Sequence, residues 1–200
     1  MASFSLQESV ERFLDRTASA EPAPSGGSVA AVAVAMAAGL VAMAARLAHE
    51  WPQATEVIER AEVLRSQMAA LALADEDAYA KVIEALRLPP DSPARDAELA
   101  SALSGAADAP LAVAEAGAEV AVLAALVAQE GNDRLRGDAL VAAELAEAGA
   151  RGAAELVAIN LAGRDDPRIE RAKDLGGDAA RTMSFASARG LRIDSQPRLE

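Results

Sequence analysis

The sequence contains no cysteine, one histidine, one tryptophan and one tyrosine, and aromatic residues make up only 2% of its 200 residues. Without cysteine the protein can form no disulfide, no thiolate metal site and no cysteine nucleophile. The lone histidine offers no histidine-rich metal cluster, and no Ser-His-Asp order is present. Acidic residues outnumber basic ones, and the net charge of −12 argues against binding to nucleic acid through a broad basic face.

Hydrophobic residues make up 52% of the chain, and alanine dominates that share. Alanine and leucine with few β-branched runs favour helices, whose small surfaces allow close packing. A chain of this length is long enough for one domain with its own core. We predict an all-α fold: a single-domain bundle of about five to six long helices over residues 1–190, followed by a loose tail over residues 191–200.

Hydrophobic periodicity and the positions of proline and glycine define the expected helices. They cover residues 3–18, 28–50, 53–88, 94–130, 135–161 and 168–189, with a kink near Pro110. The segment 28–50 is apolar on nearly all sides, which indicates that other helices or a second copy surround it. Gly39 in its middle suggests a close helix crossing. We therefore expect a homodimer, and no membrane span, because the charge-free run is short and rich in alanine.

The turn at residues 21–28, Glu-Pro-Ala-Pro-Ser-Gly-Gly-Ser, leads directly into this apolar helix. Its prolines exclude helix on the approach, and Gly26 and Gly27 allow contacts that a side chain would forbid. Ser28 is suited to cap the helix, whose free N–H groups could hold a carboxylate or a polarised carbonyl. The simpler interpretation is a tight turn before a capped core helix.

Two acids lie on helix faces that we predict to point inward. Asp75 falls on the apolar stripe of the 53–88 helix, where a carboxylate is costly unless it is paired or hydrogen-bonded. Asp138 begins a stripe that continues through Val141, Leu145, Ala148, Gly152, Leu156 and Ile159. Each acid also has a purely structural interpretation. Asp75 could mark the end of the bundle, where the stripe meets water, and Asp138 could favour the helix dipole from the first turn.

Several motifs, taken in order, resemble one protein family. They are Pro22-Ala-Pro-Ser-Gly-Gly-Ser-Val-Ala-Ala31, Asp75-Glu-Asp-Ala-Tyr79 ahead of Leu88-Pro89 and Arg95, Gly131-Asn-Asp-Arg-Leu-Arg-Gly-Asp138, and Ile159-Asn-Leu161. From about residue 5 to residue 165 the set is similar to the formiminotetrahydrofolate cyclodeaminase and methenyltetrahydrofolate cyclohydrolase family. The chain departs from that pattern where Ser25, Arg134, Gly137 and Leu156 replace Gly, Asn, Ser and Asn. It also lacks the lysines that often follow the second helix.

The resemblance implies a folate one-carbon enzyme, a hydrolase or an ammonia lyase, that opens or closes the bridge between N5 and N10 of tetrahydrofolate by acid–base catalysis. It implies Asp138 and Asp75 as the catalytic acids, with Asp138 in a cleft that faces the start of the 28–50 helix. The residues expected to contact the substrate are Gly26, Gly27, Ser28, Tyr79, Arg95, Asn132 and Asn160. No metal or other cofactor is expected, and family members resemble homodimers formed through this domain.

Cyclohydrolase and cyclodeaminase activity both remain open at this point. The formiminotransferase domain fused in some members does not occur in these 200 residues, which slightly favours a cyclohydrolase. Two different functions also stay open: the same scaffold used for another small-molecule cyclisation, dehydration or imine reaction, and a non-enzymatic helical dimer that binds a ligand or partner. No basic region precedes an apolar one at the N-terminus, so we expect no signal peptide and a cytoplasmic protein.

Overall fold

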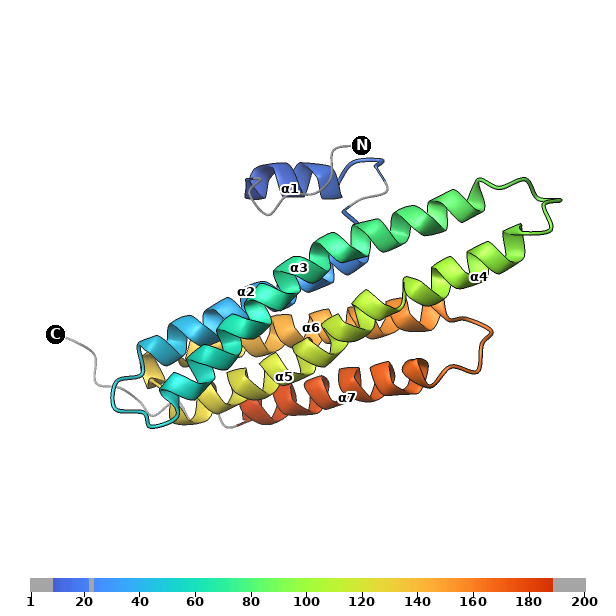
Figure 1. Ribbon diagram of the computed structural model, residues 1–200. Coiled ribbons are helices and arrows are strands. Elements are labelled where there is room, and N and C mark those ends of the chain that lie inside the picture. The colour runs from blue at the N-terminus through green and yellow to red at the C-terminus, as the bar shows by residue number, and fades with distance from the viewer. Residues whose placement is uncertain (1–8, 22–23, 189–200) are drawn as a thin grey trace.

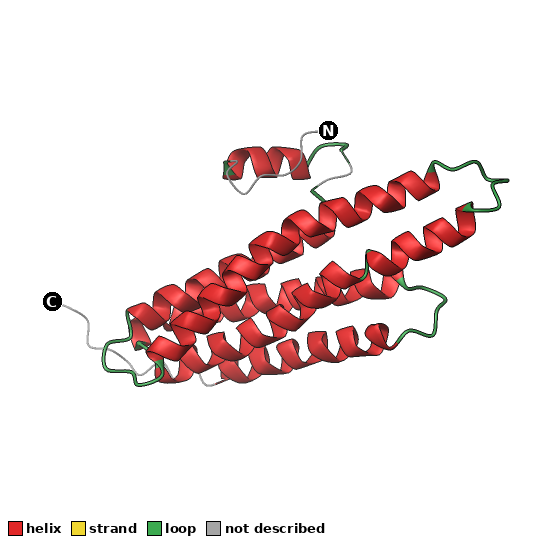
Figure 2. Ribbon diagram, in the orientation of Figure 1, coloured by secondary structure: helices red, strands yellow, loops and turns green. Residues whose placement is uncertain are grey.

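The computed structural model describes residues 9–21 and 24–188, and every regular element in these ranges is helical (Figures 1 and 2). The helices are α1 (Val10–Thr17), α2 (Gly26–Arg46), α3 (Ala54–Leu86), α4 (Arg95–Gly105), α5 (Asp108–Glu130), the short 3-10 helix η1 (Asp133–Leu135), α6 (Arg136–Asn160) and α7 (Pro167–Ala188). The predicted all-α class is confirmed, with five helices of more than 20 residues. The tail predicted for 191–200 lies outside the described residues.

Helix α5 contacts α2, α3, α6 and α7, and helix α6 contacts α2, α5 and α7 (Figure 1). Helix α2 packs on α3 and α5 as well, whereas α4 packs mainly on α3. Figure 1 shows α3 and α4 continuing together past the start of α2 as a hairpin. Helix α1 lies beside α3, and Arg16 and Glu76 form an ion pair between them at 3.6 Å.

The core is built almost entirely from alanine and valine, and Leu64, Met68 and Leu161 are its largest fully buried side chains. Two glycines mark close contacts of α6 with its neighbours. A Cβ atom on Gly117 would lie 2.9 Å from that of Ala150, and one on Gly149 would lie 2.5 Å from Cγ2 of Val34. Small side chains therefore fix how closely α5, α6 and α2 approach one another.

The close crossing predicted at Gly39 is wrong. A Cβ atom there would make only an ordinary contact of 3.7 Å, with the side chain of Arg65. Two stretches, Gly26–Arg46 and Arg95–Glu130, are long and apolar enough to cross a membrane by length and composition. In each, 56% of the most apolar window is buried inside the bundle. The apolar composition of both stretches is explained by their packing in the core of the helical bundle.

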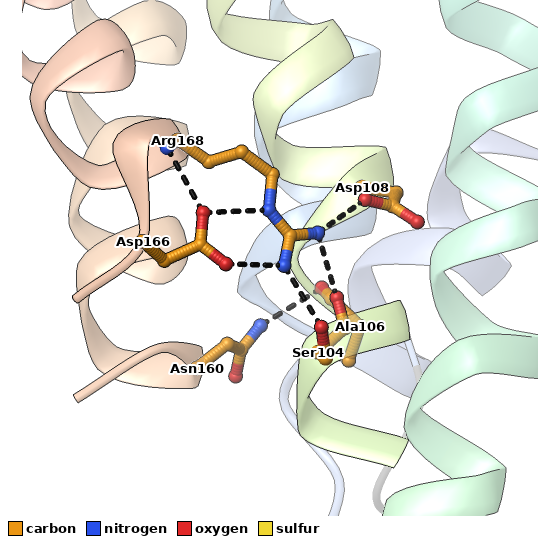
Figure 3. A network of polar contacts seen from close by, with 6 residues as sticks. All are labelled: Ser104, Ala106, Asp108, Asn160, Asp166 and Arg168. Atoms are coloured by element: carbon orange, nitrogen blue, oxygen red, sulfur yellow. Dashed lines mark hydrogen bonds and ion pairs between the residues drawn. The ribbon is translucent and has the colours of Figure 1, made fainter. Parts of the chain in front are cut away.

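Pro110 divides the helix expected over 94–130 into α4 and α5. A proline has no N–H to bond the carbonyl four residues earlier, and its ring crowds that carbonyl. The break therefore lies at residues 106–107 and not at Pro110 itself. The freed carbonyl of Ala106, a residue that is 6% exposed, accepts a hydrogen bond of 2.8 Å from Nδ2 of Asn160 (Figure 3).

Arg168, at the start of α7, ties the same break to the loop between α6 and α7 (Figure 3). Its guanidinium donates to both carboxylate oxygens of Asp166 at 3.0 and 2.8 Å and to Asp108 at 2.6 Å. It also donates to the main-chain oxygen and the hydroxyl of Ser104, at 3.0 and 2.8 Å. The hydrogen bonds from Arg168 lower the pKa of Asp166 to about 2, so this ion pair stays charged at neutral pH.

We expect Asn160→Ala to lower the free energy of unfolding by about 1–3 kcal/mol, because it leaves the buried Ala106 carbonyl without a partner. In a Pro110→Ala background the main-chain N–H of residue 110 can donate to that carbonyl. Asn160→Ala should then lower the free energy of unfolding by a smaller amount. Urea unfolding of the four proteins measures both costs. An equal cost of Asn160→Ala in the two backgrounds would contradict the role given to Asn160.

Candidate functional site

Helix α2 begins at Gly26, two residues before the predicted start. Ser25 occupies the N-cap position, with an extended backbone at φ −95° and ψ −179°. Ser28 lies in the first turn and is fully buried, at 0% exposure. The prediction that Ser28 caps the helix is therefore wrong, and burial removes its side chain from any surface that a substrate can reach. Gly26 is exposed at the helix start, and Gly27 is buried.

Asp75 is directed inward from α3 towards the start of α2, as its place on the apolar stripe predicted. It is only 8% exposed. The hydroxyl of Ser25 donates to Oδ2 of Asp75 at 2.6 Å, and the hydroxyl of Ser28 lies 3.3 Å from the same oxygen. The buried carboxylate thus obtains hydrogen bonds that offset the free-energy cost of its burial.

Gly27 explains how the Asp75 carboxylate can lie so close to α2. A Cβ atom at position 27 would fall 2.5 Å from Cγ and Oδ2 of Asp75, and closer still to Oδ1. Real Cβ atoms do not approach other atoms so closely, so any side chain at this position would displace the carboxylate. The glycine that the sequence suggested for a close contact makes that contact with Asp75.

The surroundings of this carboxylate are partly open. Tyr79, one helical turn beyond Asp75 on α3, is 39% exposed. Leu156 of α6 borders the helix start, since its Cδ1 lies 4.0 Å from the Cβ position of Gly26. A groove of about 770 Å³ runs between α3 and α4, and Ala78 lines it. An exposed glycine, a tyrosine and a groove therefore lie at the same end of the bundle as the buried acid.

Arg95 and Asn160 have other surroundings. Arg95 begins α4 and lies across the hairpin from the end of α3, roughly three helical turns beyond Asp75. Its Nε atom is buried and has no hydrogen-bond partner among the described residues. Asn160 lies one turn past Leu156, but its amide donates to the Ala106 carbonyl, so its N–H group supports the fold.

Asn132 and Asp138 lie at the opposite end of the bundle. The Asn132 amide donates to the main-chain oxygen of Leu47, at the end of α2, at 3.0 Å, and its oxygen accepts from the N–H of Arg134 at 3.0 Å. Helix α6 runs antiparallel to α2, so Asp138 near its start is also far from Gly26. The 21 residues of α2 span roughly 30 Å. The prediction that Asp138 faces the start of α2 in one cleft is therefore wrong within one chain.

The stripe predicted to bury Asp138 is also wrong, because it faces outward. Val141 is 48% exposed and Ile159 is 65% exposed. The buried face of α6 is instead formed by small residues: Ala139, Ala142, Ala143, Ala146, Gly149, Ala150, Ala153 and Val157. Alanine permits the close approach to α2 and α5 that larger residues would prevent. Asp138 is half-buried in the first turn, where an acid favours the helix dipole.

Ser25 is the site residue that sequence reasoning missed, because it stands out there only as a departure from a family pattern. A signal is present, since serine is a preferred N-cap residue and directly precedes the glycine pair. A helix start two residues earlier places Ser25 beside the buried acid. The assembled group, a buried carboxylate held by hydroxyls next to an exposed helix start, can move a proton or stabilise a nearby cation.

We expect Gly27→Ala to lower the free energy of unfolding by about 1–3 kcal/mol, because the new methyl group must displace the Asp75 carboxylate. Gly26→Ala is the matched control in the same helical turn, since its methyl group would meet only Leu156 at 4.0 Å. Gly26→Ala should raise the free energy of unfolding by up to about 1 kcal/mol, because alanine has the better helix propensity. Denaturant unfolding measures both, and equal changes would contradict the contact between Gly27 and Asp75.

Comparison with known proteins gives a consistent result. The sequence profile of the formiminotransferase-cyclodeaminase family matches residues 9–174. The methenyltetrahydrofolate cyclohydrolase of Methylorubrum extorquens is 38% identical over 183 residues, which cover 85% of this chain and 88% of that protein. The crystal structure of formiminotetrahydrofolate cyclodeaminase from Thermotoga maritima matches with a TM-score of 0.82 and 27% identity, over 91% of this chain and 95% of that one. The resemblance seen in the motifs is thereby confirmed, and the chain belongs to the formiminotransferase-cyclodeaminase family.

Proposed function

We propose that this protein is a methenyltetrahydrofolate cyclohydrolase, a folate one-carbon enzyme that acts on the N5,N10 bridge. The observation that carries this proposal is the 38% identity to a protein named for that activity, along 88% of that protein's length. The fold match to a formiminotetrahydrofolate cyclodeaminase supports the same class of substrate. A cytoplasmic location stays a prediction.

The reaction requires proton transfer and no change of oxidation state. Water adds to the methenyl carbon, which shares a positive charge with the two bridging nitrogens, and a carbon–oxygen bond forms. The bond from that carbon to one nitrogen then breaks and leaves a formyl group on the other. One proton of the water is released, and the second ends on the departing nitrogen. The enzyme must therefore supply a group that takes and returns protons at this carbon.

Asp75 is the carboxylate that we propose for this role. It lies against Gly27, the residue after the exposed Gly26, and is held in place by hydroxyl groups, so it needs little rearrangement when the substrate binds. Its negative charge would also attract the cationic methenyl bridge. The groove between α3 and α4, which begins near Ala78, offers room for the rest of the substrate.

The same residues would serve a cyclodeaminase, in which N10 attacks the formimino carbon and ammonia leaves after it is protonated. The two substrates therefore have to be compared directly. That comparison also separates folate chemistry from the two other functions. A scaffold used for another cyclisation or imine reaction would turn over neither folate, and a non-enzymatic dimer would turn over nothing.

We expect the purified protein to hydrolyse methenyltetrahydrofolate, measured as loss of the methenyl absorbance band, and Asp75→Asn to lower kcat by about 10²-fold or more. Asp77→Asn is the matched control, because Asp77 is an exposed acid on the same helix. Turnover of formiminotetrahydrofolate alone would make the protein a cyclodeaminase. A normal rate for Asp75→Asn would remove Asp75 from the reaction.

We also propose that the protein is a homodimer, through an apolar face formed by α2 and α6. On this face Val29 and Met36 of α2, Leu47 directly after it, and Val141 and Ile159 of α6 are between 37% and 65% exposed. The two helices pack against each other along their length, so their exposed sides adjoin. Large apolar residues outside an alanine core are what a second copy would cover.

A two-fold axis that crosses the middle of α2 near Met36 would have a further effect. It would place the start of α2 in one copy beside the end of α2 in the other. The partner's Asp138 would then lie near Gly26 and Asp75, although the two acids lie at opposite ends of a single chain. In this arrangement each site would contain residues from both chains. This would explain why the motif residues Asn132 and Asp138 lie far from Asp75 within a single chain.

We expect light scattering to give a dimer at micromolar concentration, and Met36→Glu to give an inactive monomer, because a charge on this face would be buried without a partner. Val63→Glu is the control, since Val63 is 44% exposed on α3, away from the face. A monomeric parent protein, or a dimeric Met36→Glu variant, would contradict this interface.

Shared sites can be tested separately by mixing inactive Asp75→Asn and Asp138→Asn subunits. Random exchange makes half of the dimers mixed, and each mixed dimer holds one intact site of two, so about a quarter of the parent rate should return. No recovery after subunit exchange would contradict a site shared between chains.

A further inference from the structure

We propose that Ser25 is a positioning residue for the reaction: its hydroxyl holds the Asp75 carboxylate in one orientation beside the start of helix α2. This inference rests on the proposed function, in which Asp75 moves the proton. It assigns to Ser25 a role that is separate from starting helix α2.

The geometry of Ser25 shows that its side chain does not serve as a helix cap. Its backbone has the extended conformation of an N-cap residue, and a serine there normally accepts a hydrogen bond from an N–H of the first turn. In the described part of the chain no such side-chain bond is present at the start of α2. The hydroxyl instead donates to Oδ2 of Asp75, 50 residues away, at 2.6 Å. This distance is typical of a hydroxyl that donates to a charged carboxylate.

Ser28 can replace this bond only in part. A hydroxyl has a single proton, and the Ser28 hydroxyl has two possible acceptors. The main-chain oxygen of Ala72 lies at 3.0 Å, and Oδ2 of Asp75 lies at 3.3 Å. The Ser28 proton is shared between these acceptors, whereas Ser25 donates to Asp75 at 2.6 Å, so Ser25 makes the shorter hydroxyl bond to Asp75 among the described residues.

Both hydroxyl contacts involve Oδ2, and no hydrogen bond to Oδ1 is present among the described residues. Gly27 lets the carboxylate rest against the helix start, and Ser25 stops it from rotating there. Oδ2 is thereby hydrogen-bonded to the protein, whereas Oδ1 lies closest to Gly27 and accepts no hydrogen bond among the described residues, so its lone pairs stay unused. A base that is held in one orientation reacts faster than one that can rotate, because it is aligned with the substrate for more of the time.

The test compares Ser25→Ala with Ser25→Thr in the parent protein and in the Asp75→Asn variant, with methenyltetrahydrofolate as the substrate. Ser25→Ala should lower kcat about tenfold with little change in KM, because it removes a hydrogen bond to a charged group without removing a helix cap. Ser25→Thr keeps a hydroxyl and should restore most of the rate. In the Asp75→Asn background Ser25→Ala should have no further effect, because the group that it positions is gone.

A crystal structure of Ser25→Ala supplies a readout that does not depend on activity. We expect the carboxylate of Asp75 to turn away from its place beside Gly27. An unchanged kcat, an equal loss in the Asp75→Asn background, or an unmoved carboxylate would each overturn the role of Ser25 while the parent enzyme stays active. A parent protein without turnover of methenyltetrahydrofolate would instead overturn the proposed function and, with it, this role.

Discussion

Close approach between helices, which only alanine and glycine permit, is the constraint on which the rest of the structure depends. Helices α2, α5 and α6 meet through small side chains, with Gly149 against Val34 and Gly117 against Ala150. Larger residues at these contacts would push the helices apart. The same short distances allow a carboxylate from α3 to lie directly against Gly27. Larger apolar side chains are left on the outer face of α2 and α6, where a second copy of the chain can cover them.

The sequence predicted the fold class and most helix ends because helix-breaking residues separate its helical segments. Proline and glycine place the limits of α3, α6 and α7 within two residues of those observed. The inward face of α6 could not be found in the same way. A hydrophobic stripe is normally identified by its largest residues. In this bundle those residues, among them Val141 and Ile159, face outward, because the buried face of α6 is filled by small residues, most of them alanine.

The candidate site was partly predictable for a related reason. Asp75 stood out because a carboxylate on an apolar stripe requires a partner, and the structure supplies one. The partner itself could not be predicted, since Ser25 lies 50 residues away and acts only because α2 starts two residues earlier than expected. The grouping of Asp138 with the helix start failed for a topological reason. Helices α2 and α6 run antiparallel, so Asp138 at the start of α6 and Gly26 at the start of α2 lie at opposite ends of the bundle.

The proline that separates α4 from α5 also divides the molecule into regions of unequal stability. Helix α5 contributes twelve buried residues to the core, whereas α4 contributes none. Because the main-chain hydrogen bonding is interrupted at Ala106, α4 can separate from the bundle without disturbing α5. Side-chain contacts such as those of Asn160 and Arg168 hold the junction, so opening of the hairpin requires their rupture but not exposure of the alanine core. The groove between α3 and α4, which begins one turn along α3 from Asp75, is therefore bounded on one side by the part of the fold that opens at the lowest free-energy cost.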